Sequence, residues 1–79
     1  MRLNVKYFAA LREIAGIDGE TVETTATNAS ELYKELTDKY LFSLKEETLK
    51  VAINEEYEEF DTPFKEGDIV VFIPPVAGG

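Results

Sequence analysis

A single amphipathic helical segment, residues 29–40, lies near the middle of this 79-residue chain. Asn28 and Glu31 stand at its start with the spacing of a helix capping box, in which Asn replaces the usual Ser or Thr. The apolar positions recur with the period of one helical face: Ala29, Leu32, Tyr33, Leu36 and Tyr40. A helix with one apolar face has to pack on another layer of structure. The pattern therefore predicts an α+β domain in which a sheet covers one main helix.

Several short segments have the alternation or the apolar content of β-strands. They are residues 2–7, 20–25, 49–53, 57–60 and 69–73, with a turn expected at 54–56. Residues 9–15 instead favour a short helix that ends at Gly16. No repeat or linker interrupts these segments, so we expect one domain over residues 1–73, although the sequence alone leaves the strand order open.

The faces of two strands can be read from their patterns. The first strand alternates apolar and polar residues, which predicts one buried face, and Phe8 then falls on the exposed side. Residues 69–73 are five apolar residues in a row, as is typical of a central strand covered on both faces. If Val70 and Phe72 face the helix, the opposite face has to be covered by the first helical segment or by another protein.

The side-chain inventory excludes most enzyme chemistry. The chain has no cysteine and no histidine, and therefore no disulfide, no thiolate nucleophile, no zinc–thiolate site and no imidazole base. Its sixteen acidic residues lack the spacing of a cation-binding loop. We expect no metal site and no cofactor bound by this chain, and a stand-alone enzyme is the interpretation that we favour least.

The charge of the chain also limits its partners. Sixteen acidic residues against eight basic ones give a net charge of −8. This charge repels nucleic-acid phosphates and anionic membranes, and it favours a protein partner with a basic cleft. Residues 1–15 contain four charged side chains and no long apolar run, so we expect no signal peptide, no membrane span and a cytoplasmic location.

The last six residues, Pro74-Pro75-Val76-Ala77-Gly78-Gly79, have a distinctive composition. The two prolines stop a strand and favour an extended path away from the domain. The four residues after them reach roughly 14 Å at about 3.5 Å each. Glycine has no side chain, so a Gly-Gly end can pass through a channel that is too narrow for other residues. We predict that residues 74–79 form an extended, flexible tail whose carboxylate enters a neighbour's active site.

Three segments resemble the β-grasp (ubiquitin-like) sulfur carriers, and most closely the small subunits of molybdopterin synthase. They are residues 5–13 (VKYFAALRE), residues 51–54 (VAIN) and residues 67–79, which end in PPVAGG. The resemblance spans the chain, and the opening segment combined with this ending is specific. It implies a β-grasp roll, in which a mixed sheet of about five strands packs on one main helix.

The resemblance also implies a sulfur-transfer cycle at Gly79, with Gly78 as its neighbour in the reactive segment. In this family, an adenylyltransferase similar to ubiquitin-activating enzymes uses ATP to adenylate the terminal glycine. A persulfide donor then converts the adenylate to a thiocarboxylate, which donates sulfur to the cyclic pterin precursor and so builds the dithiolene of molybdopterin. The implied partners are the activating enzyme, the persulfide donor and the large subunit of molybdopterin synthase, with which the chain would form a heterotetramer.

The resemblance further implies which residues contact the large subunit. Phe8, Tyr57 and Ile73 match apolar interface positions of the family. In the tail, the implied contacts are Pro74, Pro75, Val76 and Ala77.

Two other interpretations stay open at this point. The activated terminus is suited equally to other acceptors: the thiazole of thiamine, a tRNA base, or protein lysines if the chain is a ubiquitin-like modifier. The second alternative is a passive β-grasp interaction module whose tail is chemically inert.

Overall fold

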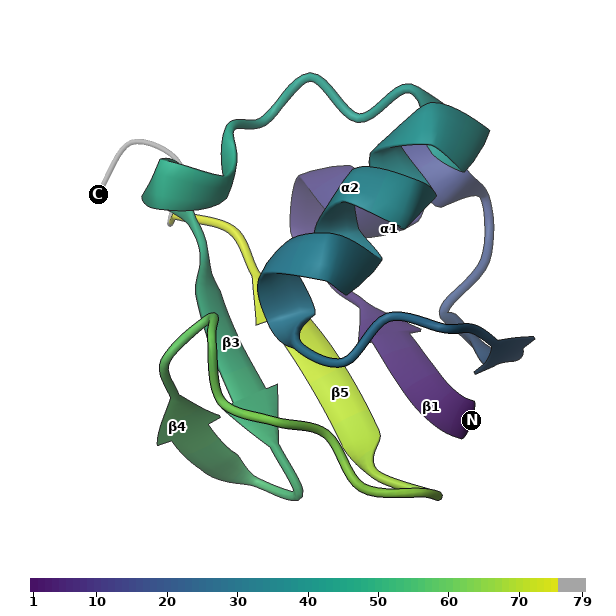
Figure 1. The fold of residues 1–79 in the computed structure, drawn as a ribbon. Coiled ribbons are helices and arrows are strands. Elements are labelled where there is room, and N and C mark those ends of the chain that lie inside the picture. Colours follow the sequence, from purple (N-terminus) through teal and green to yellow (C-terminus); the bar gives the residue numbers. More distant parts are fainter. Residues whose placement is uncertain (76–79) are drawn as a thin grey trace.

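The computed structural model describes residues 1–75, which form one mixed sheet with a main helix across one of its faces (Figure 1). The elements in chain order are β1 (Arg2–Tyr7), α1 (Ala9–Ala15), β2 (Gly19–Glu23), α2 (Ala29–Tyr40), a 3₁₀ helix (Glu46–Thr48), β3 (Lys50–Ile53), β4 (Glu56–Glu58) and β5 (Ile69–Ile73). The predicted α+β architecture, with five strands on one main helix, is confirmed.

The last strand of the chain occupies the centre of the sheet. The strand order is β2-β1-β5-β3-β4, so β5 lies between the first strand and the third. β5 runs parallel to β1 and antiparallel to β3, and the other pairs are antiparallel. Val70 and Phe72 of β5 are completely buried, as predicted for a central strand. Two segments separated by most of the chain thus form the middle of the molecule.

One face of the sheet carries the hydrophobic core. The sheet contributes Leu3, Val5, Tyr7, Val51, Ile53, Val70 and Phe72, and α2 contributes Ala29, Leu32, Tyr33 and Leu36. Leu11 is the one buried residue of α1 and belongs to the same cluster, so α1 packs at an end of this core (Figure 1). The first helical segment therefore does not cover the opposite face of the sheet, which leaves another protein as the expected cover.

Both helices begin and end at the predicted residues. The side chain of Asn28 accepts a 2.9 Å hydrogen bond from the Glu31 amide, which confirms the helix cap. The Glu31 carboxylate does not complete a capping box with Asn28, because it accepts a 2.7 Å bond from the amide of Thr27 instead. α1 ends at Gly16 in the left-handed conformation, with φ of 79°.

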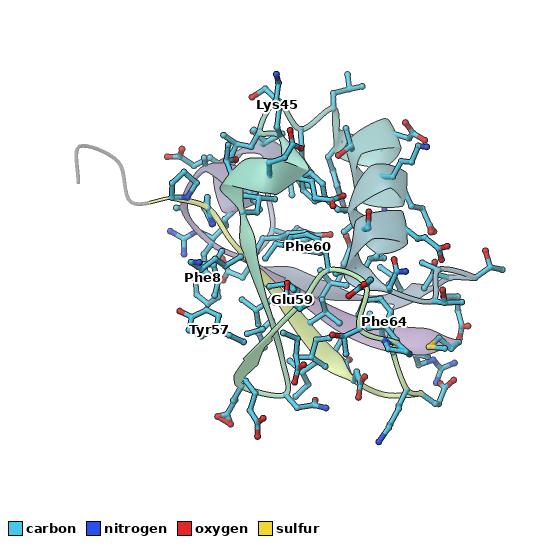
Figure 2. All side chains as sticks on the ribbon, turned by 60° about the vertical axis from the view of Figure 1, so that its left-hand side comes forward. Phe8, Lys45, Tyr57, Glu59, Phe60 and Phe64 are labelled. Carbon is cyan, nitrogen blue, oxygen red and sulfur yellow. The ribbon has the colours of Figure 1, made fainter. Side chains whose placement is uncertain are left out.

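The hairpin of β3 and β4 differs from its expected bounds. Asn54 and Glu55 both have positive φ, 52° and 73°, and form a two-residue connection, so Glu56 belongs to β4 and not to the turn. β4 then ends at Glu58, because Phe60 turns inward to pack near Phe72 with ring centroids 6.2 Å apart (Figure 2). The prediction of a strand over residues 57–60 was therefore wrong at both ends.

The predicted second strand, residues 20–25, is also shifted. β2 covers Gly19–Glu23 and stops before Thr24. The Thr24 hydroxyl accepts a 2.9 Å hydrogen bond from the amide of Ala26 and donates one of 2.6 Å to Glu35. Such a local side-chain bond to the backbone competes with strand pairing, and it turns the chain toward α2.

Candidate functional site

The face of the sheet opposite α2, here called the outer face, is defined by the strand register. Residues that alternate with the buried positions point to this face. They are Arg2, Asn4 and Lys6 of β1, Thr21 and Glu23 of β2, Lys50 and Ala52 of β3, Tyr57 of β4, and Ile69, Val71 and Ile73 of β5. No helix of the described chain lies over these positions.

Part of the outer face is an apolar patch, made by Phe8, Ala52, Tyr57, Val71 and Ile73, which we call the outer patch. Ala52 lies between Tyr57 and Val71 across the sheet. Tyr7 pairs with Phe72, so Phe8 comes next to Ile73 at the ends of two parallel strands. Figure 2 shows Phe8 and Tyr57 on the same side of the sheet, away from α2. Phe8 is 49% exposed and Tyr57 is 71% exposed, which is unusual for large apolar rings.

The chain leaves the sheet beside this patch. β5 ends at Ile73, which is half-buried. Pro74 is buried and therefore packs as part of the domain, whereas Pro75 is exposed. Four predicted site residues lie outside the described residues: Val76, Ala77, Gly78 and Gly79.

The backbone around Phe8 holds its ring outward. Phe8 has an extended conformation, with φ of −130°, and its carbonyl accepts bonds from the amides of Leu11 (3.1 Å) and Arg12 (3.4 Å). The preceding Tyr7 points into the core and Leu11 anchors α1 there. Because the residues on both sides of Phe8 are fixed, its side chain has a defined position at the edge of the outer patch.

Two polar side chains hold the hairpin that carries Tyr57. The Asn54 side-chain amide donates a 2.9 Å bond to Asp68 and accepts one of 2.9 Å from the amide of Ile69. Asp68 is buried and also accepts a 2.8 Å bond from the amide of Lys65. These bonds tie the hairpin turn to the start of β5. Sequence reasoning did not single out Asn54 or Asp68 for this role; the Asn at a turn was the available signal.

The hollows in the surface are open and shallow. A groove of about 620 Å³ lies along β3, β4 and the segment that follows β4, and it is lined by Leu49, Lys50, Val51, Tyr57, Glu58, Glu59 and Phe60. Within residues 1–75, no three acidic side chains come together as they would to hold a metal ion. In the same part of the chain, no helix is long and apolar enough to cross a membrane. What the outer face offers is a surface for binding another protein.

The family of this chain follows from its similarity to known proteins. Residues 5–79 match the model of the ThiS family. The chain belongs to the ThiS family. A relative in this family, the molybdopterin synthase sulfur carrier subunit of Haemophilus influenzae, is 36% identical over 98% of this chain and 99% of its own length. The resemblance to the sulfur carriers that the opening and closing segments indicated is confirmed.

Solved structures of the ThiS type agree with this fold. The putative molybdopterin converting factor subunit 1 of Pyrococcus furiosus has a TM-score of 0.78 and 29% identity, covering 96% of this chain and 99% of its own. A second match is a complex of subunits 1 and 2 of the molybdopterin-converting factor from Helicobacter pylori, with a TM-score of 0.69, 26% identity and full coverage of both chains. The predicted β-grasp (ubiquitin-like) fold is confirmed.

Proposed function

We propose that this chain is the sulfur carrier subunit of a molybdopterin synthase, with Gly79 as the residue that carries the sulfur. The observation that supports this most directly is the full-length similarity to molybdopterin synthase sulfur carrier subunits. The structure adds a reason of its own, because the chain leaves the sheet next to an exposed apolar patch. A partner that docks on this patch is well placed to receive the tail.

The chemistry requires that the Gly79 carboxylate be activated first, since a carboxylate is a poor electrophile. Its oxygen attacks the α-phosphate of ATP, pyrophosphate leaves, and a mixed anhydride with AMP forms. A persulfide sulfur then attacks the acyl carbon and AMP leaves. Cleavage of the resulting acyl disulfide by a thiol gives the thiocarboxylate and a disulfide. The soft, ionised sulfur attacks the cyclic pterin precursor, and hydrolysis restores the carboxylate. Two such transfers complete the dithiolene.

The proposal assigns this chain no bound cofactor and three protein partners. ATP belongs to the activating enzyme, an adenylyltransferase similar to ubiquitin-activating enzymes, and a persulfide donor supplies the sulfur. The large subunit of the synthase holds the pterin and forms a heterotetramer with the carrier. Its docking surface on this chain is the outer patch, with Phe8, Tyr57 and Ile73 as the main contacts. The proposal keeps the cytoplasmic location that was expected from the sequence.

Mass spectrometry of the tail tests this proposal. The chain is incubated with ATP, the activating enzyme, the persulfide donor and a thiol reductant. The reductant is then removed, the chain is alkylated, and the label is located by fragmentation. The chain has no cysteine, so a sulfur-directed label on the terminal peptide reports a thiocarboxylate. We expect the label at Gly79 and, after the large subunit and the pterin precursor are added, its loss together with the formation of molybdopterin.

The matched variant lacks only Gly79. It keeps every residue that the structure describes, so its thermal unfolding should equal that of the full chain while sulfur transfer is lost. A Gly79 deletion that still transfers sulfur would overturn the proposal. If the labelled chain delivers sulfur to thiazole synthase but not to the large subunit of molybdopterin synthase, the proposed acceptor changes to the thiazole of thiamine.

A further inference from the structure

The outer face does not share the charge of the rest of the molecule. The chain as a whole carries a net charge of −8. Beside the outer patch, however, the charged side chains at strand positions are lysines: Lys6 lies across from Val71, and Lys50 lies across from Ile73. Both lysines are exposed. They stand on opposite sides of β5 and so flank the centre of the patch.

Within the described chain, neither lysine has an acidic partner. The ion pairs of residues 1–75 are Arg2–Glu23, Arg12–Asp18 and Lys39–Glu20. Glu56 and Glu58 of β4 pair with Ile53 and Val51, whose side chains are buried, so these acids belong to the other side of the sheet. Glu58 and Glu59 nevertheless line the same groove as Lys50, and Asp18 lines a hollow with Lys6, but none of these three acids forms an ion pair with either lysine. Within the described chain, neither ammonium group is therefore held in an ion pair, and both can pair with a partner.

A third cation borders the patch near Phe8. Arg12 lies in the last turn of α1 and lines a hollow together with Phe8. Its 3.6 Å contact with Asp18 is loose, because the Asp18 side chain is 90% exposed. Such an exposed pair contributes little to stability and rearranges easily. The cations thus surround the end of the outer patch at which the chain leaves the sheet.

Docking on this patch takes Lys6 and Lys50 partly out of water. Their alkyl stems extend the apolar surface, but their ammonium groups lose hydration unless the partner supplies acceptors. A second copy of this chain offers no unpaired carboxylate at the described strand positions of its outer face, because Glu23 is paired with Arg2. A symmetric contact centred on the outer patch therefore brings lysine toward lysine. A partner with carboxylates on both sides of an apolar centre does supply acceptors for the two ammonium groups.

We propose that Lys6 and Lys50 determine partner specificity, by selecting a large subunit whose matching surface has acidic side chains on both sides of an apolar centre. This inference rests on the proposed function, which supplies the occupant of the outer face. Net charge alone led to a different expectation, a partner with a basic cleft. The two differ because the local charge at a docking face, and not the net charge, governs the final approach of two proteins.

The test measures the association of the chain with the large subunit of molybdopterin synthase from the same organism. The variants are Lys6→Glu with Lys50→Glu, the same pair changed to Gln, and a control with Lys34→Glu and Lys45→Glu. The control makes the same change in net charge, but at exposed lysines outside the outer face. Stopped-flow rates are recorded at about 0.05 M and about 0.5 M salt.

We expect the Glu pair to slow association about tenfold or more at low salt, and the Gln pair to have a smaller effect in the same direction. The dissociation rate of the Glu pair should rise as well, because its carboxylates then face the carboxylates of the partner in a partly desolvated contact. At high salt the association rates of the variants should converge, because the long-range interaction is screened. The control pair should change the association rate less than about twofold.

Two results would overturn the inference while leaving the proposed function intact. One is an equal change in association rate for the Lys6 and Lys50 variants and for the Lys34 and Lys45 control, which would show that the effect comes from net charge. The other is faster association of the Glu pair, which would show a basic surface on the large subunit. Light scattering that shows a wild-type dimer, strengthened by the Gln pair because the repulsion between lysines is removed, would assign the outer face to a second copy and overturn the inference too.

Two measurements on the wild-type chain show whether the proposed function itself fails, independently of the lysine variants. If the wild-type chain does not bind the large subunit and Gly79 acquires no sulfur label, the proposed function fails, and the occupant assigned to the outer face fails with it. If the wild-type chain binds and is labelled, only the lysine series decides the inference.

Discussion

The hydroxyl group of Tyr40 on α2 donates a 2.6 Å hydrogen bond to Oε2 of Glu20 on β2. The hydroxyl group of Tyr7 on β1 donates to the same oxygen at 2.6 Å, and Lys39 reaches Oε1 at 3.2 Å. Burial and the bond to Glu20 raise the pKa of both tyrosines above 10.0, so both stay donors at neutral pH. One carboxylate thus ties two strands and the main helix together.

Replacing Glu20 by Gln should lower the free energy of unfolding at neutral pH, and this loss should become smaller at acidic pH. Burial acts to raise the pKa of Glu20, but the bonds from Tyr40, Tyr7 and Lys39 outweigh it and hold the pKa below 4.5. The stabilisation from this lowered pKa is present above pH 4.5 and is lost as the pH falls through the folded-state value. We expect Glu20→Gln to lower the free energy of unfolding by about 2 kcal/mol at neutral pH.

Urea unfolding at neutral pH and at about pH 3 measures this effect. The difference between Glu20→Gln and wild type should shrink at the acidic value. Glu13→Gln, an exposed acid on α1, is the control and should behave as wild type. A Glu20→Gln chain as stable as the control at neutral pH would contradict the role of this carboxylate.

Two glycines near α1 should respond differently to substitution by Ala. Gly16 has φ of 79° and no atom within 4 Å of an added Cβ, so only the backbone conformation opposes Ala, at about 1 kcal/mol. At Gly19 an added Cβ would lie 2.7 Å from the carbonyl oxygen of Val5, and β1 and β2 would have to separate. We expect Gly19→Ala to cost about 3 kcal/mol. Urea unfolding ranks the two, and equal costs would contradict the clash.

Leu41 ends α2 in a conformation that suits glycine. It has φ of 60° and is 79% exposed, so its side chain contributes little packing to offset the strained backbone. We expect Leu41→Gly to raise the free energy of unfolding by about 1 kcal/mol. Thermal or urea unfolding measures this gain. Leu41→Ala, which shortens the side chain but keeps the Cβ, should gain much less.

Phe8→Ala should weaken partner binding without unfolding the chain. The ring is 49% exposed and lies in the outer patch, so its removal creates no large cavity. If the large subunit docks there, we expect affinity to fall about a hundredfold, as for an aromatic anchor. Calorimetry measures the affinity. Leu41→Ala removes an exposed apolar group outside the outer patch, and it should bind normally.

Much of the secondary structure could be predicted from local pattern. The period of α2, the alternation in β1 and the run of apolar residues in β5 each reflect a single segment and its solvent exposure. The bounds of β4 could not be predicted in this way. They depend on the positive φ of Asn54 and Glu55 and on the packing of Phe60 against Phe72, which involves a distant strand.

The candidate site depends on tertiary structure to a greater degree. The sequence by itself determined that Phe8 is exposed, that residues 69–73 form a central strand, and that the chain ends in a narrow, glycine-rich segment. Only the tertiary structure decided that Phe8, Tyr57 and Ile73 lie on one face with Lys6 and Lys50 beside them. The physical reason is strand order: β5 pairs with β1 and β3 at once, and this long-range backbone pairing brings together residues that no local pattern relates.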